Sequence, residues 1–219
     1  TTLYQFEEAD NFGSLIRPDV TDVDGMLKIL ESKNVSGQLF LSLTHQKVLK
    51  ALRQADYLSP KYHVVIANPP YMGSGGMNGR LKTWVKDNYA NGKSDLFSAF
   101  IERNIDLAQP SGAIAMITMH SWMFLSSFEA LRAKILNQNT ILSMAHLGAR
   151  AFNSIGGEVV STASFIIKNA NYQDYKGCYL NLTDGNSEEE KEEAILQAIQ
   201  DSSCGWLYFA SSSEFRKIP

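Results

Sequence analysis

The sequence has little of what marks metal-binding or disulfide-rich proteins. Only 2 of its 219 residues are cysteines, Cys178 and Cys204, and neither belongs to a CxxC pair. The 4 histidines show neither HExxH nor any other metal-ligand spacing. We therefore expect no metal site, and we expect both thiols to be free in a reducing cytoplasm.

An excess of basic charge and a long apolar run are also missing. Lys and Arg number 20 against 23 Asp and Glu, which gives a formal net charge of −3 and no general basic surface for nucleic acid. The longest uncharged stretch, Leu107 to Phe128, is interrupted by Pro110 and Gly112, so it predicts strand, loop and helix start rather than a membrane span. If DNA is the substrate, most of the phosphate-binding surface should lie elsewhere.

The composition, 44% hydrophobic and 20% charged, is that of a soluble globular chain with one sizeable core. The chain starts at Thr1 without a Met or a signal-like segment, so we expect it to be a piece of a longer protein. Residues 1–170 are predicted to form the catalytic portion of one domain. Residues 171–219 are predicted to extend that domain or to begin the next region.

Strand-like and helix-like patterns alternate along the chain, which predicts an α/β fold with a largely parallel sheet. The β-branched run at 62–67 predicts a strand buried on both faces. Helices are expected at 44–57, from a cap at Ser94 to Pro110, after a Ser126/Glu129 capping box, and after a Ser187/Glu190 capping box. Further strands are expected at 113–118, 140–147 and 159–167.

The sharpest motif is the tetrapeptide Asn68-Pro69-Pro70-Tyr71, directly after the strand expected at 62–67. In open α/β sheets, ligands bind outside the carboxyl ends of the strands, so the tetrapeptide lies where a substrate is expected. The two prolines fix φ near −65° and remove two backbone donors, which leaves acceptors without competing N–H groups.

Together these residues can bind an exocyclic amine. The Asn68 side-chain oxygen and the Pro69 carbonyl can accept both hydrogens of one amino group, which frees the nitrogen lone pair to attack an electrophilic methyl group. Tyr71 can stack on the ring that bears the amine, and a base inside a duplex has to be flipped out to reach it. The structural alternative is a proline-rich turn that ends a strand.

The tetrapeptide resembles the catalytic motif of S-adenosylmethionine-dependent amino methyltransferases, above all the N6-adenine DNA methyltransferases. Stretches from Lys93 to Glu102, Gly112 to Met123, Leu131-Arg132 and His146 to Glu158 are similar to the PglX-type methyltransferases of BREX phage-defence systems. The resemblance covers roughly Phe12 to Lys168, most of the chain. It implies a Rossmann-like methyltransferase fold, adenine methylation in a restriction-modification or antiviral defence system, and double-stranded DNA with a flipped adenine as partner.

The resemblance also implies roles for individual residues. Asn68 and the Pro69 carbonyl would bind the adenine N6 amino group, Pro70 completes the motif, and Tyr71 would stack on the flipped base. Phe152 resembles the second aromatic residue that such enzymes place against the adenine, with a core phenylalanine as the alternative. Asp95 is either part of this likeness or an acid in the first turn of a helix.

Two features set this sequence apart from a complete enzyme of that kind. No strand is followed by the Gly-rich turn and the acidic residue that hold a nucleotide cofactor, so the S-adenosylmethionine half-site is expected upstream and the isolated chain is expected to be inactive. The Gly-rich segment Gly73 to Gly79 lacks a P-loop ending. It is interpreted as a flexible loop beside the site, with Arg80 and Lys82 near phosphate, or as a plain surface loop.

Other functions remain open at this stage. The same tetrapeptide resembles the motif of methyltransferases that act on a glutamine side chain of release factors, and the N4 amine of cytosine offers the same geometry. A non-catalytic DNA-binding or interaction module that works with other defence proteins is the alternative from a different class.

Overall fold

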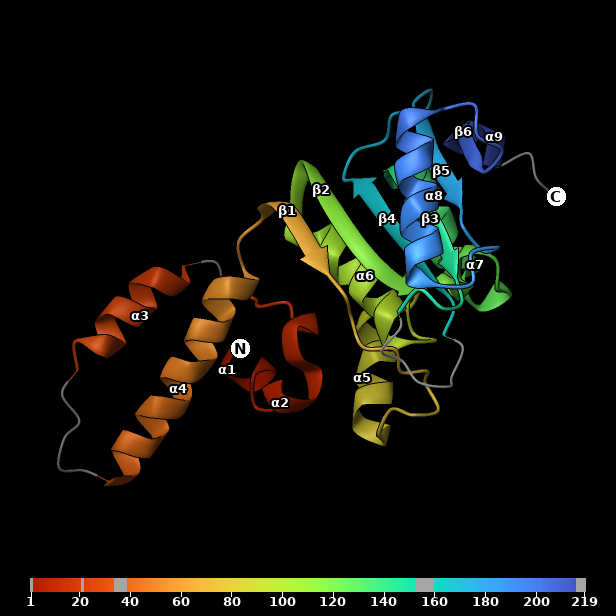
Figure 1. Cartoon of the computed structure of the whole chain (residues 1–219). Coiled ribbons are helices and arrows are strands. Elements are labelled where there is room, and N and C mark those ends of the chain that lie inside the picture. Colours follow the sequence, from red (N-terminus) through yellow and green to blue (C-terminus); the bar gives the residue numbers. More distant parts are fainter. Residues whose placement is uncertain (1, 21, 34–38, 153–159, 216–219) are drawn as a thin grey trace. The chain divides into compact units, whose positions relative to one another are not determined.

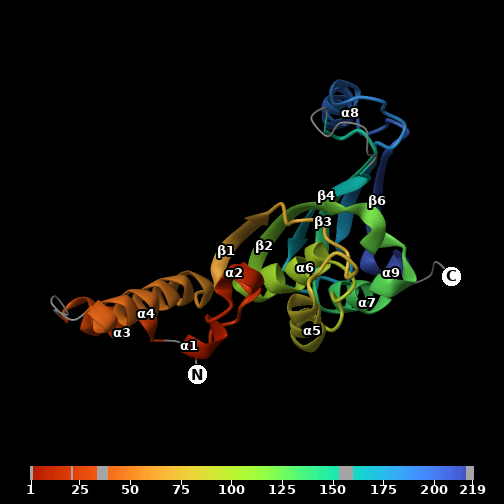
Figure 2. The same ribbon diagram turned by 90° about the horizontal axis from the view of Figure 1, so that it is seen from below.

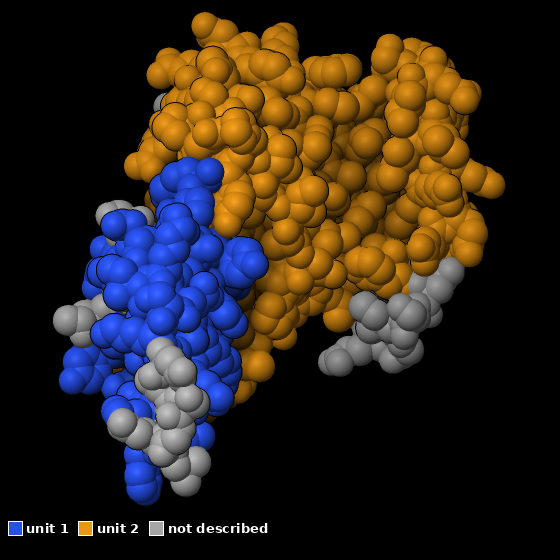
Figure 3. Space-filling model, turned by 90° about the vertical axis from the view of Figure 1, so that its left-hand side faces the viewer, with its two compact units in different colours: residues 1–61 blue, residues 62–219 orange. Residues whose placement is uncertain are grey.

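The computed structural model describes residues 2–20, 22–33, 39–152 and 160–215. Contacts within the chain divide it into two compact units, Thr1–Lys61 and Tyr62–Pro219 (Figure 3). None of the helices in the described ranges combines the length and the apolar character that a membrane span requires.

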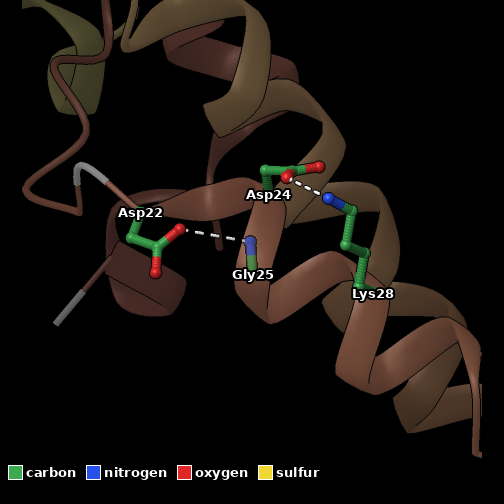
Figure 4. Close-up of polar contacts among 4 residues, drawn as sticks. All are labelled: Asp22, Asp24, Gly25 and Lys28. Carbon is green, nitrogen blue, oxygen red and sulfur yellow. Dashed lines mark hydrogen bonds and ion pairs between the residues drawn. The ribbon is translucent and has the colours of Figure 1, made fainter.

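The first unit is helical. It contains α1 (Thr2–Gln5), α2 (Ala9–Phe12), the 3-10 turn η1 (Gly13–Leu15), α3 (Val23–Glu31) and α4 (Leu39–Leu58). The helix expected at 44–57 is confirmed as part of α4, which begins five residues earlier. Asp22 caps α3 by accepting a hydrogen bond from the Gly25 N–H at 3.2 Å, and Lys28 pairs with Asp24 one turn along (Figure 4).

The second unit is built on one six-stranded sheet in the order β1-β2-β4-β3-β5-β6 (Figure 1). The strands are β1 (Tyr62–Ala67), β2 (Ala108–Met119), β3 (Thr140–Gly148), β4 (Thr162–Lys168), β5 (Lys176–Asn181) and β6 (Leu207–Ser211). The predicted α/β class is confirmed, and β1, β2, β3 and β5 run in one direction. The sheet is nevertheless mixed, because β4 lies antiparallel between β2 and β3 and β6 lies antiparallel to β5.

Helices α5 (Gly79–Asn88), α6 (Leu96–Leu107) and α7 (Glu129–Gln138) lie on one face of this sheet, and α8 (Glu188–Gln200) lies apart from them (Figure 2). The 3-10 turns η2 (His120–Met123) and η3 (Ser126–Phe128) connect β2 to α7, and α9 (Ser212–Phe215) follows β6. The main core fills the space between α6, α7 and the sheet, and its fully buried members include Phe97, Ile101, Ile114, Leu131, Ile135 and Ile167.

The strand at 62–67 has the predicted bounds, but the expectation that both of its faces are buried is wrong. Val64 and Ile66 are 55% and 77% exposed, whereas Val65 and Ala67 pack against the core. The reason is topological. Among the described residues, β1 pairs only with β2, and α6 covers only one of its faces.

Two of the predicted helix caps differ in the structure. α6 is capped by Asp95 and not by Ser94, whose backbone carbonyl accepts from Ser74 instead. α7 has no side-chain cap, because Ser126 begins the turn η3 and displaces the helix start to Glu129. The Ser187 cap of α8 is confirmed, with the hydroxyl accepting from the Glu190 N–H at 3.2 Å.

The remaining strands follow the expected pattern, with shifted ends. β2 begins at Ala108, five residues before the predicted start, and β3 extends one residue past its predicted end. β4 corresponds to the strand expected at 159–167, of which Val159 lies outside the described residues. The predicted division at residue 170 falls between β4 and β5 inside the second unit, and as a functional boundary it stays a prediction.

Candidate active site

The tetrapeptide at 68–71 follows β1 without an intervening residue. It lies at the end of the sheet where the carboxyl ends of β1, β2 and β3 are found. Asn68 and Pro70 are exposed, whereas Pro69 is buried. Within the described residues, no hydrogen bond occupies the carbonyl oxygen of Pro69. The buried Pro69 fixes the backbone next to the Asn68 amide. That the Asn68 oxygen and the Pro69 carbonyl accept the hydrogens of an amine stays a prediction.

Tyr71 is half-buried and ties the tetrapeptide to the core. Its ring meets Phe97 of α6 edge-on at a centroid distance of 6.3 Å, and Phe97 in turn contacts Phe128 at 5.5 Å. Its hydroxyl donates a hydrogen bond of 3.3 Å to the Asn68 side-chain oxygen. Burial raises the pKa of the Tyr71 hydroxyl above its ordinary value of 10.0, so the group stays protonated and remains a donor near neutral pH.

The chain beyond Tyr71 is fixed by hydrogen bonds to the start of α6. The Met72 N–H donates to the Asp95 carboxylate at 3.0 Å, and the Met72 carbonyl accepts from the Leu96 N–H at 3.0 Å. Gly73 forms a β-bridge with Asp95, and the Ser74 N–H donates to the Ser94 carbonyl at 2.9 Å. The sequence predicts Asp95 to be either part of the family likeness or an acid in the first turn of a helix. In the structure it caps the helix and holds this loop.

The Gly-rich segment ends where Asn78 caps α5, with its side-chain oxygen accepting from the Leu81 N–H at 2.9 Å. Arg80 and Lys82 lie in the first turn of α5, and both are exposed. The structure therefore shows a loop bonded to α6 at its start and to α5 at its end. A role of Arg80 and Lys82 toward phosphate stays a prediction.

Phe152 lies four residues beyond β3 and is half-buried. Among the described residues, no ring contact joins Phe152 to Tyr71, so the structure does not bring these two predicted site residues together. β1 and β3 are separated by three strand spacings, about 14 Å. Residues 153–159, which complete the family-like stretch after Phe152, lie outside the described residues.

One pair of side chains at this end of the sheet is not predicted by the sequence. His120, just after β2, and His146, near the end of β3, are joined by a hydrogen bond of 2.7 Å between Nδ1 and Nε2. Phe124 packs edge-on against His120 at 4.8 Å. Burial lowers the pKa of both imidazoles below the ordinary 6.5, and the pKa of His146 is lowered further by the proximity of His120 and Lys191.

Within residues 62–152, the described part of the chain that holds these three strand ends, none of the ends provides a nucleotide-binding turn. β1 is followed by the tetrapeptide, β2 is followed by the turn η2, and β3 ends at Gly148, which has a φ of +63°. A dinucleotide-type site needs a pair of glycines between a strand and a helix, so these residues by themselves do not fit S-adenosylmethionine.

Comparison with known proteins assigns a class to this arrangement. A family model described as Eco57I restriction-modification methylase matches residues 20–152, more than half of the chain. The chain therefore belongs to the Eco57I restriction-modification methylase family. The matched residues include the tetrapeptide, the start of α6 and Phe152.

Two curated relatives are more specific. The chain is 40% identical to "Adenine-specific methyltransferase PglX" of Lacticaseibacillus casei (strain Zhang), with 99% of the chain covered. It is 41% identical to "Adenine-specific methyltransferase BrxX" of Escherichia coli O9:H4 (strain HS), with 100% covered. The chain spans 18% of the length of each relative. The resemblance to PglX-type methyltransferases is thereby confirmed.

Solved structures confirm the fold. A chain of a type I restriction-modification system superposes with a TM-score of 0.55 at 15% identity, covering 74% of this chain and 37% of that one. The Type ISP restriction-modification enzyme LlaGI, solved with a DNA substrate mimic, superposes with a TM-score of 0.54 at 18% identity, covering 74% of this chain and 18% of that one.

Proposed function

We propose that the protein, in its full natural length, transfers a methyl group from S-adenosylmethionine to the N6 amino group of adenine in DNA. The observation that carries the proposal is the tetrapeptide at the end of β1, with an exposed Asn68 amide, a Pro69 carbonyl that no donor among the described residues reaches, and a backbone anchored to α6. The names of the two curated relatives, both adenine-specific methyltransferases, support adenine as the acceptor.

The chemistry follows from the acceptors. The Asn68 oxygen has two acceptor sites, of which the Tyr71 hydroxyl uses one at 3.3 Å, so one is left for an amine hydrogen. The Pro69 carbonyl takes the second hydrogen. Both bonds draw the hydrogens out of the base plane, which weakens conjugation of the nitrogen lone pair with the ring and directs it at the methyl donor. S-adenosylmethionine, when bound, would supply the methyl group: its methyl–sulfur bond would break as the nitrogen–methyl bond forms, S-adenosylhomocysteine would leave, and the nitrogen would lose one proton to water. No strong general base is required.

The acceptor base has to leave the duplex to reach this edge of the sheet. We propose that Tyr71 stacks on the flipped adenine, and that Phe152 approaches it from the end of β3. Double-stranded DNA in the cytoplasm is the proposed partner. Other defence proteins are proposed on the likeness to PglX-type enzymes alone.

The test is nucleoside mass spectrometry for N6-methyladenine on DNA from cells that express the full-length protein, with Asn68→Ala alongside. We expect modified adenine with the wild type and none with Asn68→Ala. Asn171→Ala is the matched control, because Asn171 is an exposed asparagine after β4, at the opposite edge of the sheet. N4-methylcytosine or a methylated release-factor glutamine in place of methyladenine would identify a different acceptor, and no product at all would favour a non-catalytic module.

A titration with S-adenosylmethionine tests whether the residues that bind the cofactor lie outside residues 1–219. Since the described residues at the ends of β1, β2 and β3 provide no nucleotide-binding turn, residues 1–219 alone should bind S-adenosylmethionine only weakly. The full-length protein should bind it well. Micromolar affinity of the isolated residues 1–219 would contradict this expectation.

A further inference from the structure

Asp95 connects two segments that are 23 residues apart in the chain. Its Oδ1 atom accepts a hydrogen bond from the Phe97 N–H at 3.2 Å, which caps α6, and another from the Met72 N–H at 3.0 Å. Met72 directly follows the tetrapeptide. One carboxylate oxygen therefore fixes the start of a core helix and the end of the candidate catalytic motif at once.

The surroundings make this connection rigid. Asp95 is only 8% exposed, and Phe97 and Ile101 of the helix it caps are fully buried in the core. Burial raises the pKa of Asp95, while the N–H groups of Met72, Phe97 and Leu96 act in the opposite direction. The two backbone bonds of Met72 and the β-bridge at Gly73 leave the loop little freedom to shift relative to α6.

The Gly73 position fits the same arrangement. A Cβ atom built on Gly73 would lie 3.7 Å from Asp95 Oδ2, an ordinary contact distance, so the loop backbone runs directly along the carboxylate. Tyr71 is held from the other side by its edge-on contact with Phe97, the residue whose N–H Asp95 accepts. Asp95 and Phe97 thus act on the tetrapeptide from one and the same helix turn.

We propose that Asp95 is a positioning residue for methyl transfer, which holds the Asn68–Tyr71 acceptors in the orientation the amine requires by fixing Met72 to the start of α6. The proposal rests on the proposed function. Asp95 itself touches no reacting atom. Its contribution is geometric, and a displacement of about 1 Å at a reacting centre can lower a rate about 100-fold.

An ordinary helix cap offers the matched control. Asp22 caps α3 through the Gly25 N–H at 3.2 Å, and this bond lies within its own helix (Figure 4). Replacing either aspartate by serine keeps a capping oxygen and shortens the side chain by one bond, which removes the reach of Asp95 to Met72. Asp95→Ser and Asp22→Ser therefore make the same chemical change, and only the former affects the loop.

The experiment measures kcat and KM for DNA methylation by the full-length protein, with tritiated S-adenosylmethionine, for the wild type, Asp95→Ser, Asp95→Asn and Asp22→Ser. We expect kcat of Asp95→Ser to fall about tenfold or more. Its KM for DNA should stay within about threefold of the wild-type value, because the DNA-binding surface is unchanged. Asp22→Ser should keep wild-type kcat. Asp95→Asn should also stay within about threefold, since the amide oxygen can accept the same two N–H groups.

Wild-type kcat in Asp95→Ser would overturn the proposal. If Asp95→Ser does not fold, Asp95→Asn tests the proposal. A loss of kcat in Asp95→Asn as large as that in Asn68→Ala would show that the charge of Asp95 matters and not its hydrogen bonds. That result would contradict the positioning role. The proposed function is tested independently of Asp95. It requires that the wild type methylates adenine and that Asn68→Ala does not, whatever the result for the Asp95 variants.

Discussion

The carboxyl ends of β1, β2 and β3 lie at the same end of the sheet. The polar groups that follow β1 and those at the ends of β2 and β3 differ in their exposure and in their hydrogen-bond partners. After β1, the Asn68 amide is exposed and the Pro69 carbonyl has no donor among the described residues. After β2 and in β3, the His120 and His146 imidazoles are half-buried and bond to each other at 2.7 Å.

The difference separates acceptors that keep a site open for a substrate from imidazoles that bond to each other. Acceptors that must take hydrogens from a substrate need to keep acceptor sites open, so bonds to neighbouring groups have to hold the segment in place. The Met72, Asp95 and Leu96 bonds supply that support at β1. The histidine pair uses a polar atom of each ring internally, and we therefore assign it to structure.

The largest expected effect contrasts Asn68→Ala with His146→Gln. Removing the Asn68 amide takes away a hydrogen bond to the reacting amine, and losses of about 100- to 1000-fold in kcat are typical when one such polar group is deleted. His146→Gln should stay within about threefold, since glutamine can still bond to His120. Steady-state kinetics of the full-length protein on DNA would measure both. A loss in His146→Gln as deep as that in Asn68→Ala would place the histidine pair inside the catalytic site.

An intermediate effect is expected at Tyr71, which belongs to both the motif and the core. Tyr71→Ala should lower kcat/KM by about 5- to 150-fold, because stacking of a base on an aromatic ring contributes about 1–3 kcal/mol. Tyr71→Phe keeps the ring and its contact with Phe97, and it frees the Asn68 oxygen from the 3.3 Å bond. We expect it to remain close to the wild type. Equal losses in the two variants would shift the role from the ring to the hydroxyl.

The sequence predicts the end of β1 more completely than it predicts the histidine pair at the ends of β2 and β3. The β-branched run at 62–67 and the tetrapeptide after it are local patterns, and β1 has the predicted bounds with the motif at its carboxyl end. The exposed face of β1 could not be foreseen, because its position at the edge of the sheet depends on the order of strands that lie far apart in the sequence.

Contacts between distant residues account for the other misses. The bond from Met72 to Asp95 joins residues 23 apart, and the bond from His120 to His146 joins residues 26 apart. Across the antiparallel strand β4, Thr118 and His146 both pair with Ala163, and His120 follows Thr118 by two residues, so the two histidines meet only once the sheet has formed. No rule for the sequence spacing of metal ligands or of residues on one helix face predicts the contact between His120 and His146. The one usable signal was that both histidines lie at the ends of predicted strands.

The smallest expected effect is a change in how stability depends on pH. Burial holds the pKa of His120 and of His146 below 6.5 in the folded chain, so in the window below pH 6.5 the unfolded chain binds protons more readily than the folded one. The free energy of unfolding therefore has its full contribution from these groups above about pH 6.5, and it loses that contribution as the pH falls. His120, Lys191 and the ring of Phe124 face His146, and none of them is an anion that could reverse this sign.

His146→Gln should consequently flatten the decline in stability between about pH 7.5 and 5.5, while the two proteins differ little at the upper end. Urea unfolding at a series of pH values measures this directly. His63→Gln is the control, because His63 is an exposed histidine on β1, the strand that ends in the open acceptors. Parallel curves for His146→Gln and the wild type would mean that the pair is as solvated as a surface histidine. The contrast between a closed pair at β2 and β3 and open acceptors at β1 would then lose its physical basis.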